Sequence, residues 1–207
     1  RRAASGPHNT RRNRRAGTGT AAGSARREAG INWAIGTHTC TCADALNMFE
    51  ATRLACTLSR VQGPDYEEWL ESGQALKMAT EAGAKALGWE GQIGRIAPGY
   101  KADIVMLGLD SITYVPLNDA VNQIVFAENG ESVRDVMVDG RMVVKDGQVT
   151  NVDMEKLRAE VEASVMRQIP ARGAARETME KLAVHVGPFC AGFAAQDFVV
   201  NRFVGGK

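Results

Sequence analysis

Apolar residues recur along this chain with two different periods, and each period predicts its own elements. Residues 31–35 form a short apolar run with the length of a buried strand, which Gly36-Thr37 interrupts. Farther along, apolar residues fall at helical spacing and predict a helix with one buried face; they are Leu46, Phe49, Leu54, Leu58 and Val61. A buried strand followed by an amphipathic helix is therefore the first predicted unit.

A polar segment joins this strand to this helix. His38 stands at the carboxyl end of the strand, residues 39–43 form a polar loop, and Asp44 occupies the place of a helix N-cap. Strand, polar residue, loop and helix make up the repeating unit of a (β/α) barrel, and such barrels carry their chemistry at the carboxyl ends of the strands. His38 is therefore the candidate functional residue of this unit.

The middle of the chain predicts a second helix and a return into strands. Gln74–Leu87 is a helical stretch rich in small residues, and Gly88 follows it as a C-cap. Pro98-Gly99 has the order that a type II turn prefers, and residues 102–107 then form an apolar strand. Asp103, at the start of that strand, is expected to be a structural acid.

The segment Val133–Thr150 predicts a β-hairpin. Apolar residues occupy alternate positions on both sides of Asp139-Gly140, which is the signature of a type I′ turn. A second pair, Asp146-Gly147, starts the next reversal of the chain. We expect this hairpin to be scaffolding without functional residues.

Two helices are predicted after the hairpin. The first runs from Asp153, as a possible cap, to Ile169, where Pro170 stops it. The second covers residues 174–185 and ends near His185, where a cation suits the helix dipole. The aromatic tail 189–204 is expected to dock against the body of the chain or a second subunit.

Bulk composition is that of an ordinary globular protein, with 44% apolar and 24% charged residues among 207. Nothing approaches the ~18 consecutive apolar residues of a membrane span. The four cysteines, Cys40, Cys42, Cys56 and Cys190, show neither a disulfide framework nor a CxxC pair, which favours a reduced, cytoplasmic compartment. The Cys40-Thr41-Cys42 spacing suits neither structural zinc nor a redox motif.

The net charge of +1 conceals an asymmetry. Residues 1–30 contain eight Arg and one Glu, so that segment carries +7 and the remainder carries −6. Residues 1–27 lack a periodic apolar pattern, and we expect a basic arm that is disordered or non-native. A transit peptide and a nucleic-acid-binding arm remain alternatives, although no aromatic residue interleaves the arginines as in single-strand binders.

Three segments in this order resemble the amidohydrolase superfamily, in its methylthioadenosine/S-adenosylhomocysteine deaminase and triazine (chloro)hydrolase branch. AGINWAIGTHTCTCADALNMFEATR resembles the last catalytic strand and its helix, and ALKMATEAGAKALGWEGQIGRIAPGYKADIVML resembles the helix and return into a small β domain. VRDVMVDGRMVVKDGQVT resembles the closing hairpin. The resemblance runs from about Glu28 to Thr150.

The resemblance implies an α/β fold, with the C-terminal part of a metal-dependent hydrolase barrel and the last strands of a composite β-sandwich. It divides the chain into the arm at 1–27, the last barrel strand and helices at 28–95, the sandwich portion at 96–150, and C-terminal helices and tail at 151–207. It also implies hydrolysis of carbon–nitrogen bonds outside peptides, by deamination or dechlorination of a small nitrogen heterocycle. Zinc or another divalent metal would activate the attacking water.

One departure bears on activity. The family's Gly-Thr-Asp is Gly36-Thr37-His38 here, either by substitution or by a sequence error, since the two codons can differ by one base. His38 can bind zinc through one nitrogen, but it cannot copy a carboxylate that accepts a proton and stays anionic. The only other histidines are His8 and His185, to which we give no metal role, so the first strand's His-x-His pair is missing.

Two hypotheses follow for the whole chain. In the first, it is the C-terminal fragment of an amidohydrolase, inactive as written, with His38 as its one candidate metal and catalytic residue. In the second, it is a non-catalytic remnant or interaction module. A homo-oligomer is compatible with both hypotheses, and nucleic-acid binding through the arm is a weaker third option.

Overall fold

The computed structural model describes residues 5–10, 13, 17, 19 and 29–194. Within them the chain divides into two compact units, one running up to Gln148 and the other beginning at Val149. Each unit is described by itself below.

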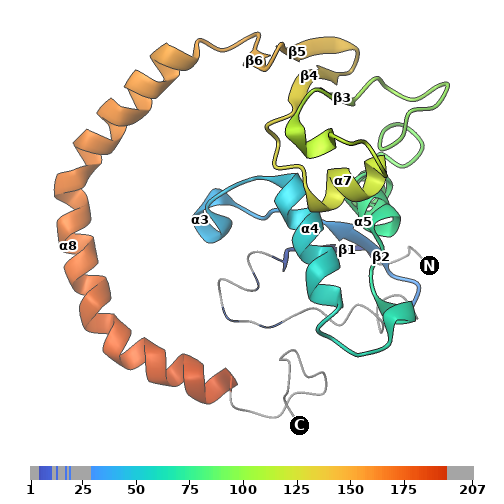
Figure 1. Ribbon diagram of the computed structural model, residues 1–207. Coiled ribbons are helices and arrows are strands. Elements are labelled where there is room, and N and C mark those ends of the chain that lie inside the picture. The colour runs from blue at the N-terminus through green and yellow to red at the C-terminus, as the bar shows by residue number, and fades with distance from the viewer. Residues whose placement is uncertain (1–4, 11–12, 14–16, 18, 20–28, 195–207) are drawn as a thin grey trace. The chain divides into compact units, whose positions relative to one another are not determined.

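The first unit begins with two parallel strands. β1 (Ser5–His8) pairs with β2 (Asn32–Ile35) so that His8 lies opposite Ile35, and the Gly36 N–H donates to the His8 carbonyl at 3.2 Å. Figure 1 shows the two strands side by side. The prediction of a disordered or non-native arm at 1–27 is therefore wrong for Ser5–His8, because pairing with β2 satisfies backbone groups without any apolar pattern. Most of the remaining arm lies outside the described residues.

The helix after β2 starts later than predicted. A single turn, α3 (Cys40–Ala43), ends at Asp44, which has a φ of 62° and is a C-cap. The N-cap of α4 (Met48–Ser59) is Asn47, whose side chain accepts from the Glu50 N–H at 3.1 Å. The prediction of Asp44 as the N-cap is wrong. Asp and Asn are both good N-caps, but the extra turn α3 ends at Asp44, so Asn47 caps the helix that follows.

Small residues of α4 form its buried face. Ala51, Thr52, Ala55 and Cys56 are buried, whereas the predicted residues Leu46 and Val61 are 58% and 45% exposed because they lie beyond the helix ends. The buried core comprises Ile35, Ala51, Ala55, Cys56, Leu70, Ala75, Met78 and Val125. Small side chains on α4 let its backbone approach β2 and α5 closely, so the larger apolar residues of the predicted face are displaced to its margins.

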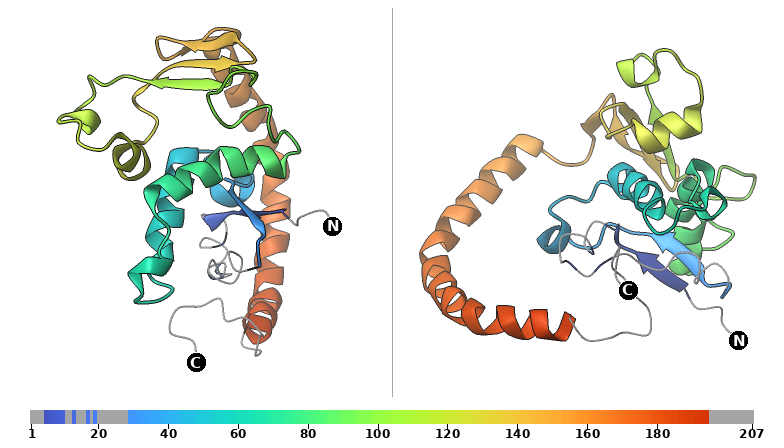
Figure 2. Two further views of the ribbon diagram at one scale, coloured as in Figure 1. Left: turned by 90° about the vertical axis from the view of Figure 1, so that its right-hand side faces the viewer. Right: turned by 60° about the horizontal axis from the view of Figure 1, so that its bottom comes forward.

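The predicted helix at Gln74–Leu87 is two helices. η1 (Tyr66–Glu68) leads to α5 (Ser72–Ala79), and after a break at Thr80 the chain forms α6 (Glu81–Ala86). Gly88 has a φ of 78°, and the N–H groups of Gly88 and Trp89 donate to the carbonyls of Lys85 and Ala84. This Schellman arrangement confirms the predicted glycine end. α5 and α6 both contact β2, and Figure 2 shows these helices, in green, beside the strand.

A second sheet has the strand order β3-β4-β5-β6. Its strands are β3 (Ile104–Leu107), β4 (Val133–Val138), β5 (Arg141–Lys145) and β6 (Gln148–Val149). Asp139 and Gly140 both have positive φ between β4 and β5, which confirms the type I′ hairpin. The predicted type II turn at Pro98-Gly99 is also confirmed, since Gly99 has a φ of 85° and Tyr100 N–H donates to the Ala97 carbonyl. 

Between β3 and β4 lie η2 (Ile112–Tyr114) and α7 (Ala120–Phe126), with a cis peptide bond at Val115-Pro116. The Asp119 side chain caps α7 by accepting from the Asn122 N–H at 2.9 Å. α7 contacts both α4 and α5, so this segment connects the second sheet to the helices around β2.

The second unit contains one helix, α8 (Met154–Ala194), which bends smoothly along its length in Figure 1. Asp153 caps it as predicted, accepting from the Lys156 N–H at 2.9 Å. The prediction of two helices is wrong, because Pro170 lies inside α8 and costs it local hydrogen bonding without ending it. His185 is consequently not at a helix end. Among the described residues, no helix is long and apolar enough to cross a membrane.

Candidate functional site

His38 lies just beyond the carboxyl end of β2. The side chain is exposed, and its backbone has a φ of 64°, in the left-handed region that few residues other than glycine adopt. The Thr37 hydroxyl donates to the His38 carbonyl at 3.3 Å, and the Thr39 hydroxyl lies 3.4 Å from His38 Nδ1. Two neighbouring hydroxyls therefore hold the tight turn that presents this imidazole.

His8 occupies the corresponding end of β1. Its side chain is only 4% exposed, and its ring lies 4.9 Å from the Trp33 ring at an interplanar angle of 57°. Because the strands are parallel, the two histidines lie at the same edge of the sheet, where both strands end. His8 has no predicted role from the sequence. The only signal was a polar residue after Ser5-Gly6-Pro7, which lacks the alternation that identifies a strand.

The described residues do not form a metal centre. Among them, no three His, Cys, Asp or Glu side chains gather closely enough to hold an ion. A catalytic zinc normally takes three protein ligands, so the described residues do not fit the divalent metal that the resemblance implies.

Two cysteines of this region differ in their surroundings. Cys40 near His38 is exposed, whereas burial raises the pKa of the Cys56 thiol from 9.0 to about 11. Cys56 is therefore a core thiol.

A buried carboxylate organises the loop after α7. Glu128 is 1% exposed; its Oε2 accepts from the Tyr114 hydroxyl at 2.8 Å, and its Oε1 accepts from the backbone N–H groups of Asn129 (3.0 Å), Gly130 (2.6 Å) and Ser132 (3.3 Å). These donors satisfy the charge that burial would otherwise penalise. The loop is thus wrapped around one side chain.

Arg53 of α4 binds the same loop from the other side. Its Nε donates to the Val125 carbonyl at 3.3 Å, one terminal nitrogen donates to Asn129 Oδ1 at 2.9 Å, and the other donates to the Glu128 carbonyl. Asn47 Nδ2 also donates to the Asn129 carbonyl, at 2.8 Å. The helix that follows the candidate site is therefore tied to the end of α7 and to the loop between α7 and β4. 

The pKa values in this network move in opposite directions. Burial raises the pKa of Glu128, but the hydrogen bonds from Tyr114, Ser132 and Gly130 outweigh burial and hold it below its ordinary value. Burial, the hydrogen bond to Glu128 and the negative charge of Glu128 all raise the pKa of Tyr114. At neutral pH the pair is an ionised carboxylate and a neutral phenol, an arrangement suited to structure rather than proton transfer.

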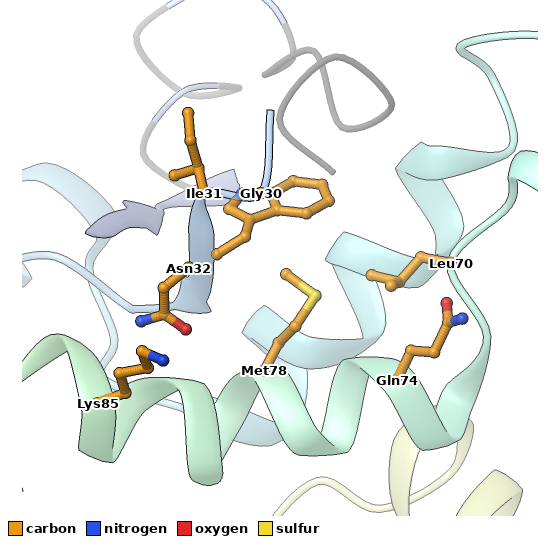
Figure 3. Close-up of a pocket in the computed structure, with 8 residues that line it drawn as sticks. Gly30, Ile31, Asn32, Leu70, Gln74, Met78 and Lys85 are labelled. Carbon is orange, nitrogen blue, oxygen red and sulfur yellow. The ribbon is translucent and has the colours of Figure 1, made fainter. Parts of the chain in front are cut away.

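A cavity of about 420 Å³ lies at the other end of β2. Gly30 and Ile31, which precede β2, line it together with Leu70 and with Gln74 and Met78 of α5 (Figure 3). This cavity opens at the amino end of the strand, whereas both histidines lie at the carboxyl end. It is therefore separate from the candidate site.

Two parallel strands with polar residues at their carboxyl ends, a helix packed behind them and an appended antiparallel sheet are the arrangement expected of one part of a (β/α) barrel with a small β domain. The sequence model of the amidohydrolase family matches residues 2–143, and the chain belongs to this family. The match begins well before Glu28 and includes β1, which precedes the resemblance found between Glu28 and Thr150.

Curated relatives agree with this membership. The chain is 35% identical over 160 residues to the 5-methylthioadenosine/S-adenosylhomocysteine deaminase of Acetivibrio thermocellus, covering 77% of this chain and 37% of the relative. It is 36% identical over 133 residues to the enzyme of the same name from Caldanaerobacter subterraneus subsp. tengcongensis, covering 64% and 30%. The chain thus spans about a third of the length of these relatives.

Solved structures are similar as well. An adenosine deaminase from Xanthomonas campestris with bound zinc has a TM-score of 0.75 and 29% identity, over 79% of this chain and 37% of that one. Atrazine chlorohydrolase from Arthrobacter aurescens TC1, complexed with zinc, has a TM-score of 0.71 and 28% identity, over 76% and 35%. The amidohydrolase resemblance and the α/β barrel class predicted from sequence are confirmed.

Proposed function

We propose that this chain supplies the closing strands of the barrel in a hydrolase acting on carbon–nitrogen bonds outside peptides. The observation that carries the proposal is the family match over residues 2–143, which includes both parallel strands and most of the second sheet. The substrate class is a small nitrogen heterocycle that loses an amine or a halide, by analogy with relatives named for methylthioadenosine, adenosine and atrazine. The cysteine pattern favours a cytoplasmic setting.

His38 is proposed as the residue of this chain that faces the reacting water. It follows β2 at the end where barrel enzymes place their chemistry. A neutral imidazole can accept a proton through one nitrogen but becomes a cation, whereas a carboxylate becomes neutral. Zinc in the similar structures would activate that water when bound, and the described residues of this chain hold no complete ligand set for it.

Replacing His38 tests the proposal. The chain is mixed with zinc and with the part of the Acetivibrio relative to which it does not align, and ammonia release from methylthioadenosine is measured. We expect His38→Asp to raise the rate by about 100-fold over the unaltered chain, within the range that one general acid–base group supplies. His38→Asn is the matched control, because it has the same size as Asp but cannot take the proton. Equal rates for the Asp and Asn variants would contradict the proposed role.

A non-catalytic interaction module is the second candidate. It is favoured by the exposed imidazole where the family resemblance places a carboxylate, and by the absence of a metal cluster among the described residues. Metal content separates the two candidates. Zinc that stays bound to the mixture in a one-to-one ratio after dialysis supports the hydrolase. A mixture made with the His38→Asp chain that neither retains zinc nor releases ammonia supports the module.

A further inference from the structure

The helix α8 carries a heptad pattern that the family match, ending at residue 143, leaves without a function. Eleven residues of the helix, spaced alternately four and three residues apart, occupy one face, and most of them are apolar. They are Met154, Arg158, Val161, Val165, Gln168, Arg172, Ala175, Met179, Leu182, Val186 and Phe189. We call these residues the α8 seam. A repeat of 3.5 residues is the pattern by which two helices supercoil around each other.

The seam is not covered by other residues of its own unit. Val161 is 53% exposed, Met179 64%, and Phe189 74%, and the other large apolar members are also exposed. Exposed apolar rows of this length on one helix are typical of an interaction surface. Leu157, Met166, Ile169 and Val184 are exposed apolar residues of α8 off the seam. Leu157 and Ile169 directly flank it, and scattered residues of that kind are ordinary on surfaces.

The residues that disfavour helix packing all lie away from the seam. Pro170 and Pro188 are at outer heptad positions, and so are Gly173 and Gly187. Proline at an inner position would place a kink and a poorly packing ring in the interface. The pattern therefore keeps one continuous face of α8 available along its whole length.

We propose that α8 pairs with α8 of a second copy of this chain, running antiparallel about a centre at residue 170. In this register Val161 lies opposite Met179 of the second copy, and Val165 lies opposite Ala175. Gln168 lies opposite Arg172, so two of the three polar members of the seam meet at the centre, and the third, Arg158, lies opposite Leu182. A buried polar layer of this kind is a known device for setting the register of a coiled coil.

Charge complementarity selects the antiparallel direction. Glu162 and Arg176 flank the seam on the same side, and the antiparallel register places Glu162 beside Arg176 of the second copy, twice by symmetry. Arg176 bonds Glu180 of its own helix through Nε, which leaves its terminal nitrogens able to donate. In a parallel pair Glu162 would lie about four helical turns from either Arg176.

Charge reversal in the 207-residue chain tests the pairing by sedimentation velocity over a range of concentrations. We expect a concentration-dependent dimer, weakened about tenfold by Glu162→Arg or by Arg176→Glu, because each reversal replaces two attractive contacts with two repulsive ones. The double variant E162R/R176E restores the pairs with their signs exchanged, and its dissociation constant should return to within about threefold of the original.

Matched controls make the same charge changes on the outer face. Glu177→Arg and Arg167→Glu should leave the dimer unchanged, and circular dichroism checks that each variant keeps its helix. A chain that is monomeric at every concentration would overturn the proposal. Weakening by the control variants, or no rescue by the double variant, would overturn the proposed register.

Discussion

At the scale of single residues, the best-defined chemistry is structural. Glu128 is an ionised carboxylate with almost no access to water, held by Tyr114 and by three backbone N–H groups. Hydrogen bonds to a charged acceptor are stronger than those between neutral groups. The loop between α7 and β4 therefore depends on one side chain, and the candidate site's helix depends on that loop through Arg53.

Replacing Glu128 with Gln should lower the free energy of unfolding by about 1.5–3 kcal/mol, because an amide offers one acceptor oxygen and places an N–H group among donors. Denaturant titration at neutral pH measures the change. Glu131→Gln is the matched control, since Glu131 is exposed in the same loop and its change should be within about 0.5 kcal/mol.

The same residue predicts a dependence on acid. The pKa of Glu128 is lower in the folded state than in the unfolded chain, so its contribution is present above the unfolded pKa and is lost as pH falls through the folded pKa. Glu128→Gln should remove the part of the stability loss at low pH that comes from Glu128. If the free energy of unfolding of the variant falls with pH as steeply as that of the original chain, other carboxylates cause the loss of stability in acid.

At the scale of elements, α4 owes its start to a side chain that the hydrophobic pattern does not single out. Asn47 accepts the Glu50 N–H and donates to the Asn129 carbonyl, so it caps the helix and ties it to the loop at once. One helix and one loop therefore share the amide group of Asn47. The cap also fixes where the chain leaves the polar loop that follows His38.

Replacing Asn47 with Ala should cost about 1–2 kcal/mol of folding stability, since it leaves one N–H and one carbonyl without their partners. Asn47→Asp keeps the cap acceptor and loses only the bond to Asn129, so it should cost less. Thermal unfolding of the two variants measures both effects. Equal losses would show that the tie to the loop, and not the cap, is what matters.

At the scale of the whole molecule, the buried groups narrow the pH range of stability from the alkaline side too. The pKa of Cys56 is about 11 in the folded state, above its ordinary value, and that of Tyr114 is raised as well. An acid with a raised folded pKa contributes stability below its unfolded pKa and loses it as pH rises through the folded value. Stability should therefore fall from about pH 9 to 11.

Cys56→Ala should flatten part of this alkaline decline, because the variant has no thiol to ionise. The thermal midpoint measured from pH 8 to 11 gives the comparison. Alkylation of the native protein at pH 8 provides a second measurement: exposed Cys40 should react, and Cys56 should react only after unfolding. Rapid modification of Cys56 in the folded chain would contradict its placement in the core.

Local patterns in the sequence determined several features of this protein by themselves. The Asp-Gly hairpin, the Pro-Gly turn, the glycine end of α6 and the Asp153 cap were all predicted correctly, because each depends on backbone conformations that only neighbouring residues control. The amidohydrolase resemblance was likewise visible in the order and spacing of three segments.

Only the tertiary structure decided the features that depend on distant partners. β1 exists because β2 pairs with it, α4 buries its small residues because β2 and α5 approach there, and Glu128 is charged because Tyr114 and a loop surround it. The candidate site shows the same division. His38 was found from the chain, whereas His8 came to the same sheet edge through strand pairing, which no local pattern of Ser5–His8 encodes.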